Sequence, residues 1–192
     1  MKYFFAIICI AIYSSSEAIA YVNTTISPQN CNIKIINDQV DSKNASCTNQ
    51  KSPNGSKGVY YYYKDNKFLI YSSVQKSTLG KFYEVKDQKR TVKNFNQTFN
   101  YIRDNWVGIG DTPQNIKTAD TKKHKVILYR LDLKYEKSCL TFSRPFGSST
   151  QILPGSEGYN HVVSMVICNL ENPNDFQSMI KIINSLSYDK IL

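Results

Sequence analysis

Two cysteines placed inside runs of β-forming residues constrain the fold of this chain most. Cys139 lies in the run SCLTF, and Cys168 ends the run VVSMVIC. If the two cysteines pair across neighbouring strands, Leu140 lies opposite Ile167 on one face, because side chains alternate along a strand. A one-residue slip would move polar residues onto that face. The pattern therefore predicts a Cys139–Cys168 disulfide between antiparallel strands.

A second strand pairing is predicted just before Cys139. If Glu136 and Lys137 form a two-residue turn, the preceding strand pairs back onto the run that contains Cys139. Together the two registers give two apolar rows on a single face: Leu133–Leu140–Ile167 and Leu131–Phe142–Met165. The agreement of the two registers favours this arrangement of three strands.

Two amphipathic helices are predicted to cover the sheet. Apolar residues recur at helical spacing between Thr91 and Trp106. Asn172 followed by Pro173 is typical of a helix start, and the apolar stripe after it is Phe176, Met179, Ile180, Ile183 and Leu186. The predicted fold class is α+β, an antiparallel sheet of hairpins or a meander with two packed helices and two disulfides.

The first twenty residues have the pattern of a secretory signal peptide. A positive start precedes the apolar run Phe4–Ile12, and Ala18-Ile19-Ala20 is the small-x-small pattern of a cleavage site. The apolar run is too short to span a bilayer as a helix, and no later stretch is long and apolar enough. We expect cleavage after Ala20 and a periplasmic or secreted location.

The mature chain is predicted to have a short arm and one domain. Residues 21–58 are polar, and Cys31 and Cys47 would close a loop there once Cys139 has paired with Cys168. An even number of cysteines in an exported chain favours disulfides. Residues 59–192 would form a single α+β domain. In its first hairpin, Asp65-Asn66 would be the turn, and Tyr60–Tyr63 would place two rings on each face.

The net charge of +9 has two interpretations. A basic chain binds anionic partners, but a lysine-rich and asparagine-rich composition is also what an A+T-rich genome produces. Arginine is the residue best suited to bidentate phosphate contacts, and only four of the 24 basic residues are arginine. Nucleic acid is therefore disfavoured as a partner.

No set of catalytic or metal-binding residues emerges from the sequence. The two histidines, His124 and His161, each start a predicted strand, where a surface histidine is the usual reading. Acidic residues are scattered, so no facing pair of carboxylates can be chosen for glycoside hydrolysis. Cysteines that are paired with each other do not bind metal. We predict no catalytic residue, no metal ligand and no cofactor.

The segment Ser143–Tyr159 is either a plain flexible connection or a recognition site. It is rich in Gly, Ser and Pro, and it joins two predicted strands as a long loop. Long loops on a stapled scaffold often carry recognition. The candidate binding residues are Arg144, Phe146, Ile152 and Tyr159.

The carboxy-terminal third resembles a group of small exported proteins of alphaproteobacteria. The residues that carry the resemblance are Cys139-Leu-Thr-Phe142, a Gly/Ser-bearing segment, a strand that ends at Cys168 and a terminal amphipathic helix. Those proteins tend to have Gly-Tyr before the second cysteine, where this chain has Val166-Ile167. The resemblance covers about fifty residues and implies a location in the cell envelope without implying an activity.

Three functions are compatible with these patterns. The leading hypothesis is a non-catalytic exported protein that binds an unknown protein or anionic ligand. The first alternative is a binder of anionic surfaces, such as an acidic glycan, a lipid or a nucleic acid. The second alternative is a secreted hydrolase-type effector that uses His124 or His161.

Overall fold

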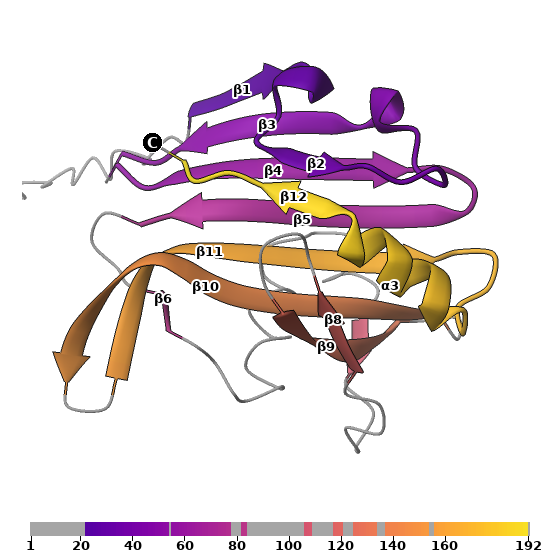
Figure 1. Ribbon diagram of the computed structural model, residues 1–192. Helices are drawn as coiled ribbons and strands as arrows, with labels where there is room; N and C mark the ends of the chain where they lie inside the picture. The colour runs from indigo at the N-terminus through magenta and orange to yellow at the C-terminus, as the bar shows by residue number, and fades with distance from the viewer. Residues whose placement is uncertain are drawn as a thin grey trace, which may run out of the picture.

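The computed structural model describes residues 22–53, 55–77, 82–83, 106–108, 117–120, 125–133, 137–153 and 156–191. The predicted signal peptide lies outside these ranges. Within them, one large antiparallel sheet dominates the fold, and a smaller layer covers one of its faces (Figure 1).

The large sheet contains ten described strands. They are β1 (Val22–Ile26), β3 (Ser46–Lys51), β4 (Lys57–Lys64), β5 (Phe68–Lys76), β6 (Phe82–Tyr83), β7 (Trp106–Gly108), β8 (Lys117–Asp120), β9 (Lys125–Leu133), β10 (Lys137–Leu153) and β11 (Ser156–Asn169). The order across the sheet is β1-β3-β4-β5-β11-β10-β9-β7, while β6 pairs with β11 and β8 pairs with β9. Every pairing is antiparallel.

The smaller layer combines the two ends of the described chain. Strand β2 (Ile33–Ile35) pairs with β12 (Leu186–Tyr188), and helix α3 (Phe176–Asn184) leads directly into β12. Two short 3₁₀ helices, η1 (Pro28–Asn30) and η2 (Ser42–Asn44), flank β2 along the chain. In Figure 1, β2, β12 and α3 lie over the same face of the large sheet.

The core fills the space between the sheet and this layer. Large side chains from the sheet and from the layer are almost fully buried and belong to one cluster: Tyr61, Tyr63, Phe68, Ile70, Leu128, Phe142, Ile33, Met179, Ile183 and Tyr188. Burial of apolar surface of this kind is the main stabilising term in a domain of this size. The β2–β12 pair therefore covers the core on the side opposite the large sheet.

The faces of the tyrosine hairpin agree with the prediction, but its turn lies one residue later than predicted. The N–H of Asp65 donates to the carbonyl oxygen of Phe68, which leaves Asn66 and Lys67 as the central residues. Tyr61 and Tyr63 are buried on the core face of β4, whereas Tyr60 and Tyr62 are half-buried on the other face. The turn begins at Asp65, whose carboxylate accepts the hydroxyl hydrogen of Tyr63 at 2.6 Å and the backbone N–H of Lys67 at 2.8 Å. These bonds hold the turn against the end of β4.

The predicted disulfides are both confirmed. Cys139 and Cys168 lie directly opposite each other on β10 and β11 and are bonded, with their Cα atoms 4.2 Å apart. Cys31 is bonded to Cys47. The predicted register between the two strands also holds, since Leu140 faces Ile167 and Phe142 faces Met165.

The predicted register before Cys139 is wrong. Lys137 pairs with Leu133, and Arg130, rather than Leu133, lies opposite Leu140. The shift is an odd number of residues, so it exchanges the two faces of β9. The buried residues Val126 and Leu128 supply the apolar contacts on β9, and the Arg130 guanidinium lies 5.9 Å from the ring centre of Phe176 in α3.

The prediction of two helices is not supported, because α3 is the one α-helix in the described ranges. Most of the predicted Thr91–Trp106 helix lies outside these ranges, and Trp106 begins strand β7. The carboxy-terminal helix also starts later than expected. Its cap is Asp175, whose carboxylate accepts the N–H of Ser178 at 3.1 Å. Asn172 lies in a turn before the helix and accepts the N–H of Asp175.

The predicted loop Ser143–Tyr159 is also wrong, because β10 and β11 run through it as a paired ribbon. Two features misled the prediction. Pro145 fits in β10 because the pairing with β9 ends at Thr141 within the described ranges, so its missing N–H removes no bond on that side. Gly147 takes φ 95° at an irregularity in the register between Phe146 and Ser149.

The segment predicted to be a polar arm contributes strands to the large sheet. β1 and β3 pair with each other, and β3 pairs with β4. The loop closed by the Cys31–Cys47 disulfide carries β2, whose isoleucines are buried in the core. No helix within the described ranges is long and apolar enough to cross a membrane.

Candidate functional site

The predicted binding residues do not form one exposed patch. Phe146 is only 7% exposed and packs on the rings of His161 and Tyr188, with 5.2 Å between ring centres in each pair. Arg144 and Tyr159 are half-buried on β10 and β11. Ile152 lies in β10, and its side chain is outside the described set. Phe146 therefore has a structural role, and binding by the other three residues stays a prediction.

His161 is a buried histidine with two hydrogen-bond contacts. Its Nδ1 atom lies 2.7 Å from Oδ1 of Asn160, and its Nε2 atom lies 3.1 Å from the carbonyl oxygen of Ile191. The same Asn160 oxygen accepts the N–H of Ser148 at 3.2 Å. A Cβ atom added to Gly147 would lie only 2.5 Å from this Asn160 oxygen, so a larger residue would clash with it. His161 thus fastens the residues after β12 to the large sheet. His124 lies outside the described ranges.

The charge state of His161 links stability to pH. Burial is the largest influence and lowers the pKa of His161 below its ordinary value of 6.5, and the nearby Lys76 and Lys190 lower it further, while the Ile191 carbonyl opposes them. The unfolded chain therefore takes up a proton at a higher pH than the folded chain. The stabilising contribution is complete above pH 6.5 and is lost as the pH falls through the lower pKa of the folded state.

We expect the His161→Gln variant to have a flatter dependence of unfolding free energy on pH than the wild type between pH 7.5 and pH 5. Urea unfolding of both proteins at several pH values measures the difference. Carboxylates titrate in both proteins, so comparison of the two curves isolates the histidine. Parallel curves would contradict the assignment of a lowered pKa to His161.

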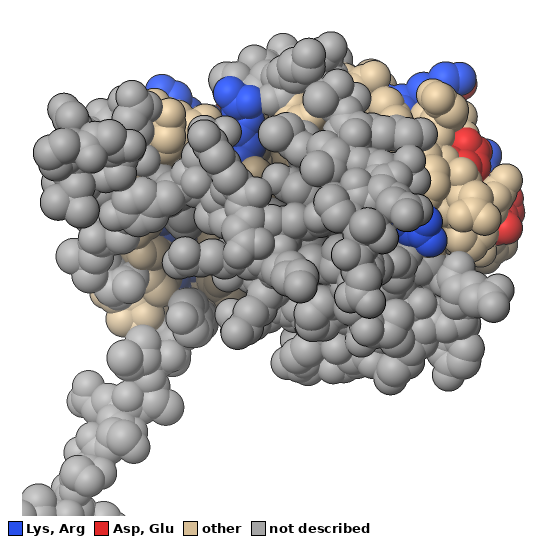
Figure 2. Space-filling model, turned by 90° about the horizontal axis from the view of Figure 1, so that it is seen from below, with Lys and Arg blue, Asp and Glu red and all other residues tan. Residues whose placement is uncertain are grey.

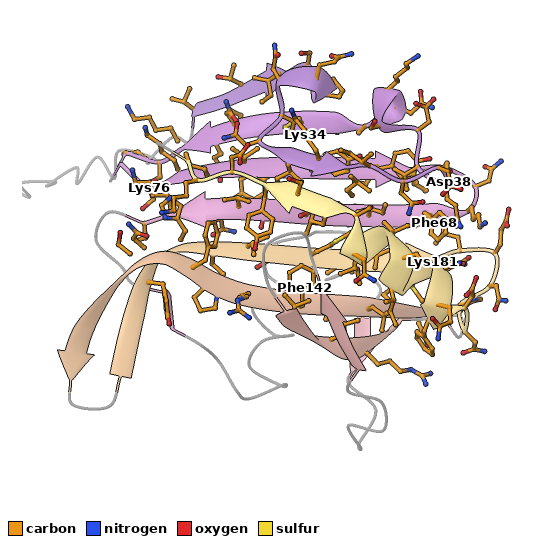
Figure 3. All side chains as sticks on the ribbon, viewed as in Figure 1. Lys34, Asp38, Phe68, Lys76, Phe142 and Lys181 are labelled. Atoms are coloured by element: carbon orange, nitrogen blue, oxygen red, sulfur yellow. A yellow bond between two sulfur atoms is a disulfide. The ribbon has the colours of Figure 1, made fainter. Side chains whose placement is uncertain are left out.

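A row of lysines crosses the strand ends near His161. Lys51 on β3 pairs with Lys57 on β4, Lys57 pairs with Lys76 on β5, and Lys76 pairs with His161 on β11. Directly paired residues of an antiparallel sheet point to the same face. We call Lys51, Lys57 and Lys76 the lysine row; Figure 3 shows Lys76 at this end of the sheet. Like charges in directly opposed positions destabilise a sheet.

Acidic side chains gather at the opposite end of the sheet. Asp65 forms the β4–β5 turn, Glu171 follows β11, and Asp175 caps α3. The acidic atoms visible in Figure 2 lie toward the right, whereas Lys76 is labelled toward the left of the molecule in Figure 3. Close to the lysine row, Asp189 and Lys190 follow β12 and are exposed. Most acidic groups of the described surface thus lie away from the row, at an end that also carries Lys64, Lys67 and Lys181.

A groove of about 360 Å³ begins at the lysine row. Its lining residues come from β1, β3, β4 and the segments beside β2 and β12: Val22, Thr24, Asn32, Asn49, Gln50, Lys51, Lys57, Gly58, Val59 and Ile191. Two lysines and several side-chain amides or hydroxyls thus surround a small apolar floor. The lining contains no acidic residue. This strand-end groove suits an anionic group flanked by hydrogen-bonding groups.

Comparison of the chain with protein-family models, with curated proteins and with solved structures found no match. The resemblance to exported alphaproteobacterial proteins therefore stays a prediction. No group of three or more His, Cys, Asp and Glu side chains within the described ranges could hold a metal ion.

The sequence prediction missed the lysine row. Lys51 and Lys57 are separated by a turn, and Lys76 is distant from both in sequence. Their common position appears only once the registers of β3, β4 and β5 are known. The available signal was that each of the three lysines stands at a strand boundary.

Proposed function

We propose that the protein is a non-catalytic exported binding protein, and that it captures an extended anionic ligand on the lysine row and the strand-end groove. The observation that carries the proposal is the direct pairing of Lys51 with Lys57 and of Lys57 with Lys76. A sheet gains nothing from three cations in opposed positions. An anion that lies across the row would interact favourably with these charges, and Lys57 also has interactions within the fold.

The spacing of the row suits a ligand with repeated charges. Neighbouring strands lie about 4.8 Å apart, so three paired lysines present positive charge over roughly 10 Å. Lysine acts as a point charge without the fixed fork of arginine, and it binds carboxylate, sulfate or phosphate groups. The half-buried Lys76 and the exposed Lys51 leave their charges near the surface.

Export is supported by the two disulfides and by the pattern of the first twenty residues. Structural disulfides persist in oxidising compartments. An extracellular or periplasmic binding protein would meet acidic polysaccharides and anionic surfaces there. Among the described residues, no observation favours the hydrolase alternative, because His161 is buried and both of its ring nitrogens have a polar contact within the fold.

The Lys51→Gln/Lys76→Gln variant is expected to bind a polyanion more weakly than the wild type and with less dependence on salt. Lys57 is kept because it has other interactions in the fold. Wild-type binding to heparin, used as a sulfated polysaccharide probe, should weaken about 40-fold between 50 and 200 mM salt if about three charges are neutralised. Each lost lysine contact should reduce the slope by about 1. Titration calorimetry at several salt concentrations measures both quantities.

The matched control is Lys64→Gln/Lys181→Gln, which removes the same charge at the opposite end of the sheet. Both of these lysines are exposed, and Figure 3 shows Lys181 far from Lys76. Equal weakening in the two variants would mean that net charge alone drives binding. Salt-insensitive binding in the wild type would overturn the proposal.

A further inference from the structure

The Cys31–Cys47 loop builds a second pocket, separate from the strand-end groove. It lies between β2, the two 3₁₀ helices and β4, and we call it the β2 pocket. Its volume is about 320 Å³, and its lining residues are Pro28, Gln29, Ile33, Lys34, Ile35, Ile36, Ser42, Lys43 and Tyr61. None of these residues lines the strand-end groove. A volume near the lower limit for ligand pockets suits a small molecule.

The walls of the β2 pocket divide into a cationic part and an apolar part. Lys34 and Lys43 are exposed, and the lining contains no acidic residue. The nearby carboxylate of Asp41 is already engaged, since it accepts the backbone N–H of Lys43 at 3.1 Å and the side-chain amide of Asn44 at 3.3 Å. Lys34 and Lys43 thus line the pocket without a carboxylate among its lining residues.

The apolar part contains an isoleucine in an unusual position. Ile36 is 65% exposed, although it follows a strand whose isoleucines are buried. Ligand pockets are lined predominantly by apolar side chains, and Ile36 is the exposed apolar side chain of this lining. Pro28 adds a further apolar surface to the lining.

Tyr61 provides an independent sign of a missing partner. Its side chain is 2% exposed, and its hydroxyl oxygen is buried without a hydrogen-bond partner among the described residues. Burial, with a smaller contribution from Tyr63, raises the pKa of Tyr61 to about 12, so the hydroxyl keeps its proton. A buried hydroxyl without a partner costs about 1–3 kcal/mol. Because the oxygen itself is buried, a polar group of a ligand would supply the missing bond only when the side chains around it move apart.

We infer that the β2 pocket binds a small amphipathic carboxylate. The carboxylate lies between Lys34 and Lys43, the hydrocarbon part contacts Ile36, and a polar group at the far end of the ligand meets the Tyr61 hydroxyl. Each of the three parts of this ligand is matched to one feature of the lining. The inference does not depend on the polyanion proposed for the lysine row, because the two sites share no residue.

Three related probes test the inference on the full mature chain. 4-Hydroxybenzoate carries a carboxylate, a ring and a hydroxyl, whereas benzoate lacks the hydroxyl and phenol lacks the carboxylate. We expect binding in the order 4-hydroxybenzoate, benzoate, phenol, with amide shifts in NMR spectra centred on residues 33–43. The Tyr61→Phe variant should bind 4-hydroxybenzoate about three- to tenfold more weakly and benzoate with unchanged affinity.

The Lys34→Gln/Lys43→Gln variant should bind both carboxylates at least about tenfold more weakly, because charge-assisted bonds are lost. Lys64→Gln/Lys181→Gln is the control of equal charge and should bind them as the wild type does. Both lysine variants change exposed residues, so they test the pocket even if Tyr61→Phe perturbs folding. Absence of binding by the wild type, shifts elsewhere in the protein, or equal binding by the two lysine variants would overturn the inference.

Discussion

The Phe142→Ala variant is expected to lose about 3–5 kcal/mol of unfolding free energy, the usual cost of deleting a buried aromatic ring. Phe142 is fully buried on β10, opposite Met165, and belongs to the cluster that joins the sheet to α3 and β12. Paired strands hold the backbone around the cavity that the ring would leave. The neighbouring side chains can therefore fill little of this cavity. In Figure 3, Phe142 lies over the ribbon formed by β10 and β11.

Urea unfolding followed by far-UV circular dichroism measures this loss. Ser143→Ala is the matched control on the next residue, whose side chain is exposed and shares a 3.0 Å hydrogen bond with Ser164. We expect the control to cost about 1 kcal/mol or less. A similar cost for the two variants would contradict the placement of Phe142 in the core and the faces assigned to β10.

The register between β10 and β11 was predictable because a disulfide and an apolar pattern constrain it together. Cys139 and Cys168 fix one pair, and the alternation of side chains then fixes every neighbouring pair. The register of β9 had no such anchor. It depended on an assumed turn at Glu136 and Lys137, and the actual pairing of Lys137 with Leu133 moved every side chain of β9 to the other face.

The layer over the sheet was predictable only in part. The apolar stripe of α3 is visible in the sequence, but Leu186 belongs to β12 and not to the helix. β12 and β2 have three residues each and lie at opposite ends of the described chain. So short a strand has too few residues to show an alternating pattern, and its pairing depends on the whole sheet having formed beneath it.

The candidate sites were the least predictable part. Gly and Pro in the segment after Phe142 indicated a loop, yet Pro145 and Gly147 occupy places where the ribbon tolerates a missing N–H or requires a positive φ. The lysine row and the β2 pocket bring together residues from separate strands. The local sequence does not indicate which distant residues become neighbours, so these sites could be found only once the strand registers were known.

The Cys139→Ala/Cys168→Ala variant is expected to lose about 3.5 kcal/mol, because the bond closes a loop with a sequence separation of 29 residues. For Cys31→Ala/Cys47→Ala, with a separation of 16 residues, the expected loss is about 3 kcal/mol. The two loops do not overlap along the chain, so the losses should be nearly additive. Their sum exceeds the lower end of the usual range of domain stabilities, about 5 kcal/mol.

Urea unfolding of the two variants and of the variant that combines all four substitutions measures these losses. The reduced wild-type protein, which lacks both bonds, is a second comparison for the combined variant. An unchanged midpoint for Cys139→Ala/Cys168→Ala would contradict a stabilising role for that bond.

Removal of the two bonds should also differ in its effect on ligand binding. Cys31 and Cys47 hold the loop that forms the β2 pocket, so their removal should weaken 4-hydroxybenzoate binding even where the protein stays folded. Removal of the Cys139–Cys168 bond, which lies between β10 and β11, should leave that binding unchanged in the folded fraction.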